Sequence, residues 1–312
     1  MVRGRVLLAA AAVAVSGASV FAGPLSDFNL IVFGDHQSGS NVWGRVAVGG
    51  NMAGNAIDVG TRLTPSGSFA GTDVLLVGGN INAGINLQAG DLRHGGTRNG
   101  HLNFNGGGPG VQSAIFDTNA ASIVAGMESE VRSFSSQLWS QSSNSSAGVG
   151  HVSNVFTLTT GAGTAGGTAV FNIDAGVLSS SQWSNITLNN AAGAATIVIN
   201  VDASNTGGYV GFTAGNIDAN TFRDIAGDII WNFFNADTIV VHREVFGSML
   251  GVNAHLTNTT NLNGSIAVNS FTQHGEVHGP NFVRSLPVIP LPTTAAMGMI
   301  GLVAVGARRR RG

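Results

Sequence analysis

The chain of 312 residues contains no cysteine and no lysine, and only 10% of its residues are charged. Without cysteine there are no disulfide bonds, no thiolate metal sites and no cysteine nucleophiles, so stability must come from packing and hydrogen bonds. Six of the fourteen arginines lie close to an end of the chain: Arg3, Arg5, Arg308, Arg309, Arg310 and Arg311. The eight others are outnumbered by 16 acidic residues, which argues against a nucleic-acid-binding surface.

Glycine, by contrast, is abundant at 46 residues, about twice its average share of roughly 7%. The low charge and the 43% hydrophobic content exclude an intrinsically disordered chain. Short runs of valine, isoleucine and alanine alternate with glycine and asparagine, which favour tight turns. This pattern predicts an all-β fold of many short strands joined by sharp corners.

Residues 1–22 have the pattern of a secretory signal peptide. Two arginines precede an apolar segment from Val6 to Val15, and Val20-Phe21-Ala22 ends the segment at a site suited to signal peptidase. An uncleaved N-terminal anchor is the alternative, although the apolar segment is short for a membrane span. We therefore expect the remainder of the chain to be exported.

The C-terminal segment, residues 286–312, predicts a transmembrane helix. The chain carries no charge from Val288 to Ala307, and four arginines follow directly. About 20 helical residues span a hydrocarbon core of roughly 30 Å, and an arginine cluster after such a segment stays cytoplasmic. The segment is expected to tether the protein to the inner membrane.

This tail resembles the PEP-CTERM family of bacterial sorting signals, which combine a Pro-x-Pro motif, a short transmembrane segment and an arginine cluster. The matching residues are Pro290, Leu291, Pro292, Arg308, Arg309, Arg310 and Arg311. Leu291 stands where the named pattern has glutamate, so the tail is a variant. The resemblance implies transient recognition and removal by a sorting protease of exosortase type. A plain membrane anchor is the alternative.

Two segments of the body repeat each other. Residues 45–54 (RVAVGGNMAG) and 75–84 (LLVGGNINAG) each contain an apolar strand, a Gly-Gly-Asn corner and the start of another strand, so that Val77 repeats Val48. A repeat of this length with near-identical corners predicts a β-solenoid (β-helix), with asparagines able to stack at equivalent corners. A β-sandwich, whose strands also recur every ~8–12 residues, is the alternative.

Residues 115–140 differ from the rest and predict one long α-helix. Apolar residues recur at spacings of three and four along one face, namely Val124, Met127, Val131, Phe134 and Leu138. Asp117 or Thr118 could cap its start. An amphipathic helix of this kind is expected to lie on the flank of the solenoid.

The sharpest chemical constellation is His274, Glu276 and His278. On a strand these alternate residues share one face, and two imidazoles with a carboxylate could bind zinc. The alternative is that they form the structural end of the domain, and we predict neither a metal nor a cofactor.

Other residues of catalytic type give no recognisable site. Asp35, His36 and Ser38 have the residue types of a serine-hydrolase triad, but no nucleophile-elbow motif is present. Six aspartates are scattered along the chain: Asp58, Asp73, Asp91, Asp174, Asp202 and Asp218. The densest acidic zone, Asp224, Asp228 and Glu244, has a spacing typical of capped turns. We therefore predict no catalytic residues and no enzyme activity.

Threonines bear on a further alternative, ice binding, which needs a flat face with regularly spaced hydroxyl groups. The T-x-T pattern occurs at Thr157/Thr159 and at Thr257/Thr259. No rank of threonines is apparent at the interval of the repeat, so the sequence argues against an ice-binding face.

Residues 25–283 resemble the choice-of-anchor A family of bacterial surface domains. The similar segments, in chain order, are FNLIVFGD at 28–35, VWGRVAVGGN at 42–51, IWNF at 230–233, FGSML at 246–250, NLNGSI at 261–266 and GEVH at 275–278. The resemblance implies a β-helical domain of the ice-binding-like adhesive type, with one flanking helix. At Leu250–Ala254 the family tends to have an Ala-Pro turn that this chain lacks.

Together these observations predict a signal peptide (1–22), a β-helix domain (23–285) and a sorting tail (286–312). The predicted function is that of an exported, non-catalytic adhesive or structural protein of the surface or extracellular matrix of a Gram-negative-type bacterium. Its expected partners are envelope polysaccharides or other surface proteins. A carbohydrate-active β-helix enzyme and an ice-binding-like module remain as alternatives.

Overall fold

The computed structural model describes residues 19–20, 23–64, 66–107, 110–149, 154–284 and 286–287. It separates a large unit, Phe21–Leu286, from a small unit made of the two ends of the chain. The predicted signal peptide and the predicted sorting tail lie outside the described residues, apart from β1 (Ser19–Val20) and β26 (Leu286–Pro287), which pair with each other. Within the described ranges, no helix has the length and apolarity needed to cross a membrane.

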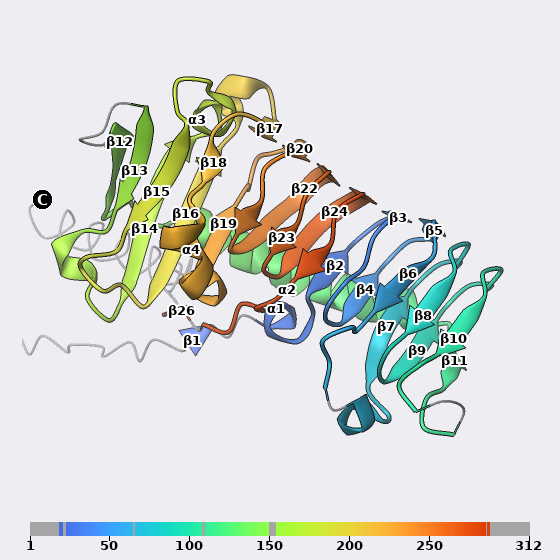
Figure 1. Cartoon of the computed structure of the whole chain (residues 1–312). Coiled ribbons are helices and arrows are strands. Elements are labelled where there is room, and N and C mark those ends of the chain that lie inside the picture. Colours follow the sequence, from blue (N-terminus) through green and yellow to red (C-terminus); the bar gives the residue numbers. More distant parts are fainter. Residues whose placement is uncertain are drawn as a thin grey trace, which may run out of the picture. The chain divides into compact units, whose positions relative to one another are not determined.

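The large unit is a stack of coils built from short parallel strands (Figure 1). Its first half contains β2 (Leu30–Val32), β3 (His36–Ser38), β4 (Val46–Val48), β5 (Met52–Gly54), β6 (Ile57–Val59), β7 (Asp73–Val77), β8 (Ile85–Leu87), β9 (Asp91–His94), β10 (Leu102–Phe104) and β11 (Ala114–Phe116). Its second half contains β12 (Ser146–Val149), β13 (Val155–Thr159), β14 (Thr168–Asp174), β15 (Asn185–Asn189), β16 (Thr196–Asp202), β17 (Tyr209–Phe212), β18 (Asn216–Ile217), β19 (Ile229–Asn232), β20 (Thr238–Val241), β21 (Val245–Phe246), β22 (Ser248–Asn258), β23 (Leu262–Asn263), β24 (Ile266–Gln273) and β25 (Val277–His278).

Helices are few. The long α2 (Ala120–Trp139) joins the two halves, and the short helices are α1 (Pro24–Asp27), α3 (Gly176–Ser179), α4 (Ala219–Phe222) and the 3-10 helices η1 (Ser66–Phe69), η2 (Ala162–Thr164), η3 (Ser204–Thr206) and η4 (Arg223–Asp228). The prediction of a mostly β chain with one long flanking helix is therefore confirmed. The helix begins later than predicted because residues 114–116 form β11.

The coils are not stacked in chain order. Along the largest sheet the strand order is β11-β9-β7-β4-β2-β24-β22-β19-β16-β14. The chain thus starts in the middle, builds the first half outward, returns along α2, and builds the second half inward until β24 pairs with β2. We call the contact of β24 with β2 and β3 the seam.

Strand register confirms the repeat read from the sequence. Val46, Ala47 and Val48 pair in parallel with Leu75, Leu76 and Val77, which is the predicted offset. The number of residues between paired strands is not constant along the stack. β2 pairs with β4, and far fewer residues separate these two strands than separate β4 from β7. Parallel pairing of this kind from coil to coil rules out the β-sandwich alternative.

The Gly-Gly-Asn corners need glycine for close packing between coils rather than for a positive φ. Gly49 and Gly78 do not have positive φ. A Cβ on Gly49 would lie 2.1 Å from the carbonyl oxygen of Phe33, and one on Gly78 would lie 2.2 Å from that of Gly49. Close approach to the preceding coil therefore demands glycine at these corners.

Side chains at these corners form the predicted ladder. The carboxylate of Asp35 accepts the backbone N–H of Asn51 (2.7 Å), and the side-chain oxygen of Asn51 accepts the N–H of Asn80 (3.0 Å). Asn80 in turn accepts the N–H of Thr97 (2.8 Å). Each corner thus satisfies the backbone donor of the next coil.

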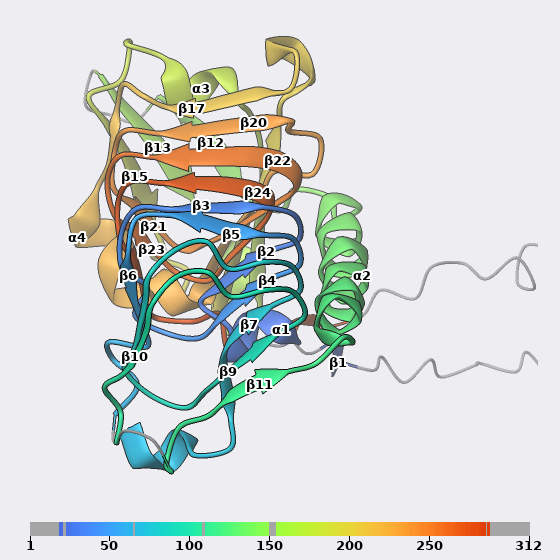
Figure 2. The ribbon, with the colours of Figure 1, turned by 90° about the vertical axis from the view of Figure 1, so that its right-hand side faces the viewer.

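Helix α2 covers one face of the stack, as Figure 2 shows from the end of the molecule. Val124, Val131, Phe134 and Leu138 are buried, as the spacing predicted, whereas Met127 is only half-buried. The buried face also contains Ser135, whose hydroxyl donates to the side-chain oxygen of Asn232. Apolar packing and this buried hydrogen bond hold the helix on strands of both halves.

Candidate functional site

The proposed metal candidates do not form one site. β24 ends at Gln273 and β25 contains only Val277 and His278, so the prediction that His274, Glu276 and His278 share one strand is wrong. Glu276 and His278 contact each other, with 2.8 Å between Oε2 and Nε2. His274 lies directly after β24, at the start of the connection to β25. No group of three His, Cys, Asp or Glu side chains suited to a metal occurs within the described ranges.

The residues of triad type are also kept apart. Ser38 donates its hydroxyl proton to the carbonyl oxygens of Ala53 and Asn55 rather than to a histidine. His36 is buried, stacks on Phe271 with 5.5 Å between ring centroids, and pairs through Nε2 with Gln273 (3.1 Å). Burial lowers the pKa of His36 to about 4. These side chains therefore serve the interior near the seam.

The densest acidic zone is likewise structural. Asp224 and Asp228 lie in η4, and Asp228 forms an ion pair with Arg284. Glu244 accepts a hydrogen bond from the amide of Asn263 (3.1 Å). The spacing of Asp224 and Asp228 predicted turns, and the structure places both residues in the short 3-10 helix η4.

Threonines of the T-x-T segments align in pairs between neighbouring coils, but within the described residues they form no rank longer than two. Thr257 pairs in register with Thr272 on the face built from β20, β22 and β24. Thr157 pairs with Thr187, with 3.1 Å between their hydroxyl oxygens. The row at Thr257 contains only two threonines. On the neighbouring strands Val240 of β20 pairs with Thr257, and Gln37 of β3 pairs with Thr272.

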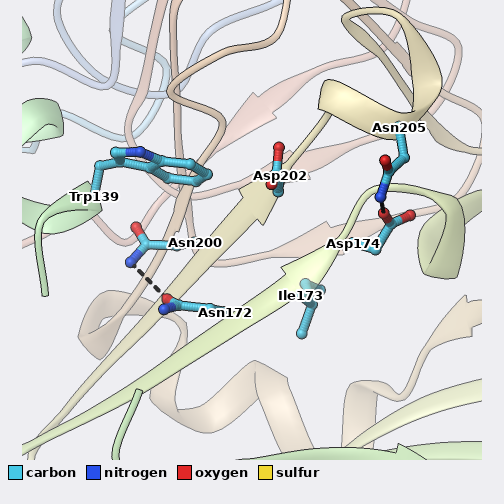
Figure 3. A pocket seen from close by; sticks show the side chains of 7 residues that line it. All are labelled: Trp139, Asn172, Ile173, Asp174, Asn200, Asp202 and Asn205. Carbon is cyan, nitrogen blue, oxygen red and sulfur yellow. Dashed lines mark hydrogen bonds between the residues drawn. The ribbon is translucent and has the colours of Figure 1, made fainter. Parts of the chain in front are cut away.

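A polar hollow of about 360 Å³ lies where α2 ends against β14 and β16. Figure 3 shows the residues that line it: Trp139, Asn172, Ile173, Asp174, Asn200, Asp202 and Asn205. β14 and β16 pair in register, so Asn172 lies beside Asn200 and Asp174 beside Asp202. We call this hollow the Trp139 pocket.

A buried amide ladder forms one wall of the Trp139 pocket. Asn232 donates to the side-chain oxygen of Asn200 (2.9 Å), and Asn200 donates to that of Asn172 (3.0 Å). Asn200 also donates to the carbonyl oxygen of Leu138 in α2 (2.9 Å), which fixes the orientation of its amide. The ladder ends at the exposed Asn172, whose Nδ2 forms no hydrogen bond within the described residues.

Two carboxylates form a second wall. Asp174 accepts the backbone N–H of Gly176 and the amide of Asn205, both at 2.7 Å. Asp202 accepts, through Oδ1, the N–H of Ser204 (2.9 Å) and the amide of Asn235 (2.7 Å). The N–H of Ser204, followed by the Asn235 amide, lowers the pKa of Asp202, so this group is an anion at neutral pH.

Trp139 supplies the aromatic part of the pocket. It is the last residue of α2 and is half-buried. One face of its indole stacks on Phe234, with 5.5 Å between ring centroids and 17° between planes. The pocket therefore combines a fixed indole with amide donors and carboxylate acceptors, and no arginine or histidine of the described chain lines it.

The sequence carries a signal for this pocket. Asn172-Ile173-Asp174 and Asn200-Val201-Asp202 repeat the N-x-D pattern at the interval that separates one coil from the next. Asp174 and Asp202 are scattered along the sequence, but the fold brings them side by side. The residues predicted to form a sorting signal, 290–292 and 308–311, lie outside the described residues.

The family model described as "Putative Ice-binding-like adhesive domain" matches residues 21–279. No match is found among curated proteins. Among solved structures, an ice binding protein from an Antarctic biological consortium is 12% identical, with a TM-score of 0.38, 84% of this chain and 92% of that chain being covered.

Two further structures are similarly distant. The ice-binding protein of the Antarctic ascomycete Antarctomyces psychrotrophicus is 14% identical (TM-score 0.30; 84% and 97% covered). The DUF3494 domain of Shewanella frigidimarina ice-binding protein 1 is 11% identical (TM-score 0.34; 83% and 96% covered). These similarities are weak in both sequence and geometry and assign no property to this chain.

Proposed function

Since the chain belongs to this family of ice-binding-like adhesive domains, we propose that it is an exported, non-catalytic adhesive protein of a bacterial cell surface or extracellular matrix. Its binding surface would be the rigid outside of the β-helix. The ligand would be an envelope polysaccharide or another surface protein, and no nucleic acid would bind.

One observation carries this proposal, namely a polar row that follows β6, β8 and β10 and reaches Glu276, next to β25. Asn41 donates to Glu276 (3.5 Å) and accepts the N–H of Asp58 (3.0 Å). The row continues as Asn86 donates to Asp58 (2.7 Å) and Asn103 donates to Asn86 (2.8 Å). Parallel strands space such groups about 4.8 Å apart, which presents a fixed array to a repetitive polymer.

The finer assignment follows the resemblances to choice-of-anchor A domains and PEP-CTERM tails. In this proposal residues 1–22 direct export and residues 286–312 tether the protein to the inner membrane. An exosortase-type protease then acts near Pro290-Leu291-Pro292. The product would remain at the surface or in the matrix of a Gram-negative-type bacterium.

The absence of enzyme activity is part of the proposal. Asp174 and Asp202 are the carboxylates that share the Trp139 pocket, and a glycosidase would need one of such a pair as a proton donor. A proton donor has a raised pKa, but the pKa of Asp202 is lowered. Asp202 is therefore suited to accepting hydrogen bonds, and both carboxylate oxygens of Asp174 already accept them from Gly176 and Asn205.

Expression of the full-length chain in a Gram-negative host that has an exosortase-type protease tests the proposal. The exported product should have lost residues 1–22 and the tail by mass spectrometry, should bind envelope polysaccharide on an array, and should release no reducing ends from it. Retention in the cytoplasm, or release of sugar fragments, would contradict the proposed function.

Ice binding is a second candidate, favoured by the adjacent Thr257 and Thr272 and by the nearby hydroxyl groups of Thr238 and Ser270. The exposed His255 stands among them, with 2.8 Å between its Nδ1 and the hydroxyl oxygen of Ser270. Thermal hysteresis that is lost in Thr257→Tyr would support this candidate. Equal freezing behaviour of both proteins and of buffer would exclude it.

A further inference from the structure

We infer that the Trp139 pocket binds one neutral sugar unit of a polysaccharide. This inference rests on the proposed adhesive function and identifies the place and chemical class of its ligand. A volume of about 360 Å³ falls within the range of roughly 300–1,000 Å³ typical of small-molecule sites.

The indole of Trp139 supplies the apolar contact. A pyranose has C–H groups on its faces and hydroxyl groups around its edge, so it suits a rigid aromatic ring beside polar groups. Stacking on Phe234 holds the indole in place before a ligand arrives. Little conformational freedom is then lost on binding.

The walls supply both donors and acceptors for hydroxyl groups. Asn172 presents an unused Nδ2 donor, because its oxygen already accepts from Asn200. Asp202 presents Oδ2, which forms no hydrogen bond within the described residues, while its Oδ1 is held by Ser204 and Asn235. Charge-assisted hydrogen bonds from sugar hydroxyls to such a carboxylate are among the stronger polar contacts.

Charge selects among saccharides. Asp174 and Asp202 line the pocket, and no cationic side chain of the described residues accompanies them, so an acidic sugar such as a uronate would be repelled. A neutral hexose or N-acetylhexosamine has no such penalty.

The same groups are less suited to coordinating a divalent cation. Calcium takes about 6–8 oxygen ligands. Both carboxylate oxygens of Asp174 already accept hydrogen bonds from Gly176 and Asn205, and Asn172 presents its nitrogen rather than its oxygen. The polar groups are therefore arranged for hydroxyl groups.

Titration of the exported product of the full-length chain tests the site. The probes are methyl glycosides of glucose, galactose, mannose, N-acetylglucosamine and glucuronic acid, together with calcium chloride, followed by saturation-transfer NMR. At least one neutral glycoside should bind with saturation below about 10 mM, and more tightly than the glucuronide.

Trp139→Ala and Asn172→Asp should each weaken that binding at least about tenfold. Asn172→Asp retains an acceptor for Asn200, replaces the donor by an acceptor and adds a negative charge, so it tests the site even if Trp139→Ala unfolds. Trp43→Ala is the matched control, since Trp43 is also half-buried but stacks on His278 on another face. It should leave the affinity unchanged.

Saturation by none of the glycosides, a response to calcium alone, or equal affinity in both pocket variants would overturn the inference. The proposed function fails separately. If the wild-type protein binds a glycoside but no polysaccharide, the proposed adhesive function is wrong and the sugar site in the Trp139 pocket stands. If Trp139→Ala still binds polysaccharide as the wild-type protein does, the adhesive function stands and the Trp139 pocket is not its binding site.

Discussion

The first and second halves of the β-helix fill their interiors with different side chains. Coils between β4 and β9 enclose a core of Val, Leu, Ile, Met and Ala without an aromatic ring among its buried members. The second half encloses Phe156, Phe171, Phe212, Phe222, Trp231, Phe233, Phe246 and Phe271.

Coil length accounts for much of this difference. In the first half Leu30 already pairs with Val46, and the longer interval between β4 and β7 contains η1 and exposed loops. In the second half Thr168 pairs with Thr196 and Ile197 with Ile229, so the coils from β14 to β19 take up far more of the chain. The coils from β19 to β24 are short again, since Ile230 pairs with Ser248. A longer coil encloses a wider interior, and large rings fill it without cavities. The same wide coils carry the Trp139 pocket on their outer side.

The largest effect is expected when the aromatic core is broken. Trp231→Ala removes a fully buried ring that stacks near Phe222 (6.0 Å) and donates through Nε1 to the carbonyl of Phe246 (3.0 Å). We expect a loss of about 4 kcal/mol in the free energy of unfolding, measured by denaturant titration. Leu75→Ala in the narrow half should lose about 3 kcal/mol. A smaller loss for Trp231→Ala would contradict the assigned role of the rings.

Acid should weaken the seam between the halves. His36 has a pKa of about 4 in the folded protein and 6.5 as its ordinary value, so below pH 6.5 the unfolded chain binds a proton that the folded chain does not. The free energy of unfolding should fall by about 3 kcal/mol between pH 6.5 and 4, at about 1.4 kcal/mol per pKa unit. His36→Gln should flatten this slope, whereas His255→Asn, at an exposed site, should not.

A smaller effect is expected at the helix that joins the halves. Asn232→Ala leaves the buried Ser135 hydroxyl and backbone carbonyl without their partner and should cost about 2 kcal/mol in thermal or chemical unfolding. Asn103→Ala, at the exposed end of a polar row in the first half, should change stability by no more than about 0.5 kcal/mol. Equal losses would show that the two rows are energetically alike.

The smallest effect, of opposite sign, is expected within α2. A Cβ on Gly126 would meet no atom within 4 Å, so Gly126→Ala should raise the free energy of unfolding by about 1 kcal/mol through helix propensity. Gly71 is equally open but has a φ of 73°, so Gly71→Ala should lower stability. Stabilisation by both substitutions would contradict the backbone argument.

Local patterns predicted the elements well. The repeat at residues 45–54 and 75–84 indicated the parallel register of β4 and β7, and the three-and-four spacing predicted the buried face of α2. These features depend on neighbours within one or two coils. The order of the coils does not, and nothing local indicates that Ile266 pairs with Leu30.

The Trp139 pocket was missed for a related reason. Asp174 and Asp202 have no chemical relation until parallel register places Asp174 beside Asp202. Trp139 belongs to the apolar end of a helix and reaches the pocket only because Leu138 is fixed by Asn200. The N-x-D pattern, repeated at the coil interval, indicates that the two carboxylates lie side by side. The position of the Trp139 indole beside them can be known only from the folded structure.

The seam determines where the molecule bears mechanical load. The chain enters the large unit beside Leu25, whose carbonyl accepts from Ser265, and leaves it at Phe282, whose N–H donates to the same Ser265 hydroxyl (3.3 Å). Asn281 also donates to the carbonyl of Ser26 (3.0 Å). A pulling force applied through either end of this unit is therefore delivered to its central coil, and both outer ends of the β-helix stay unstressed.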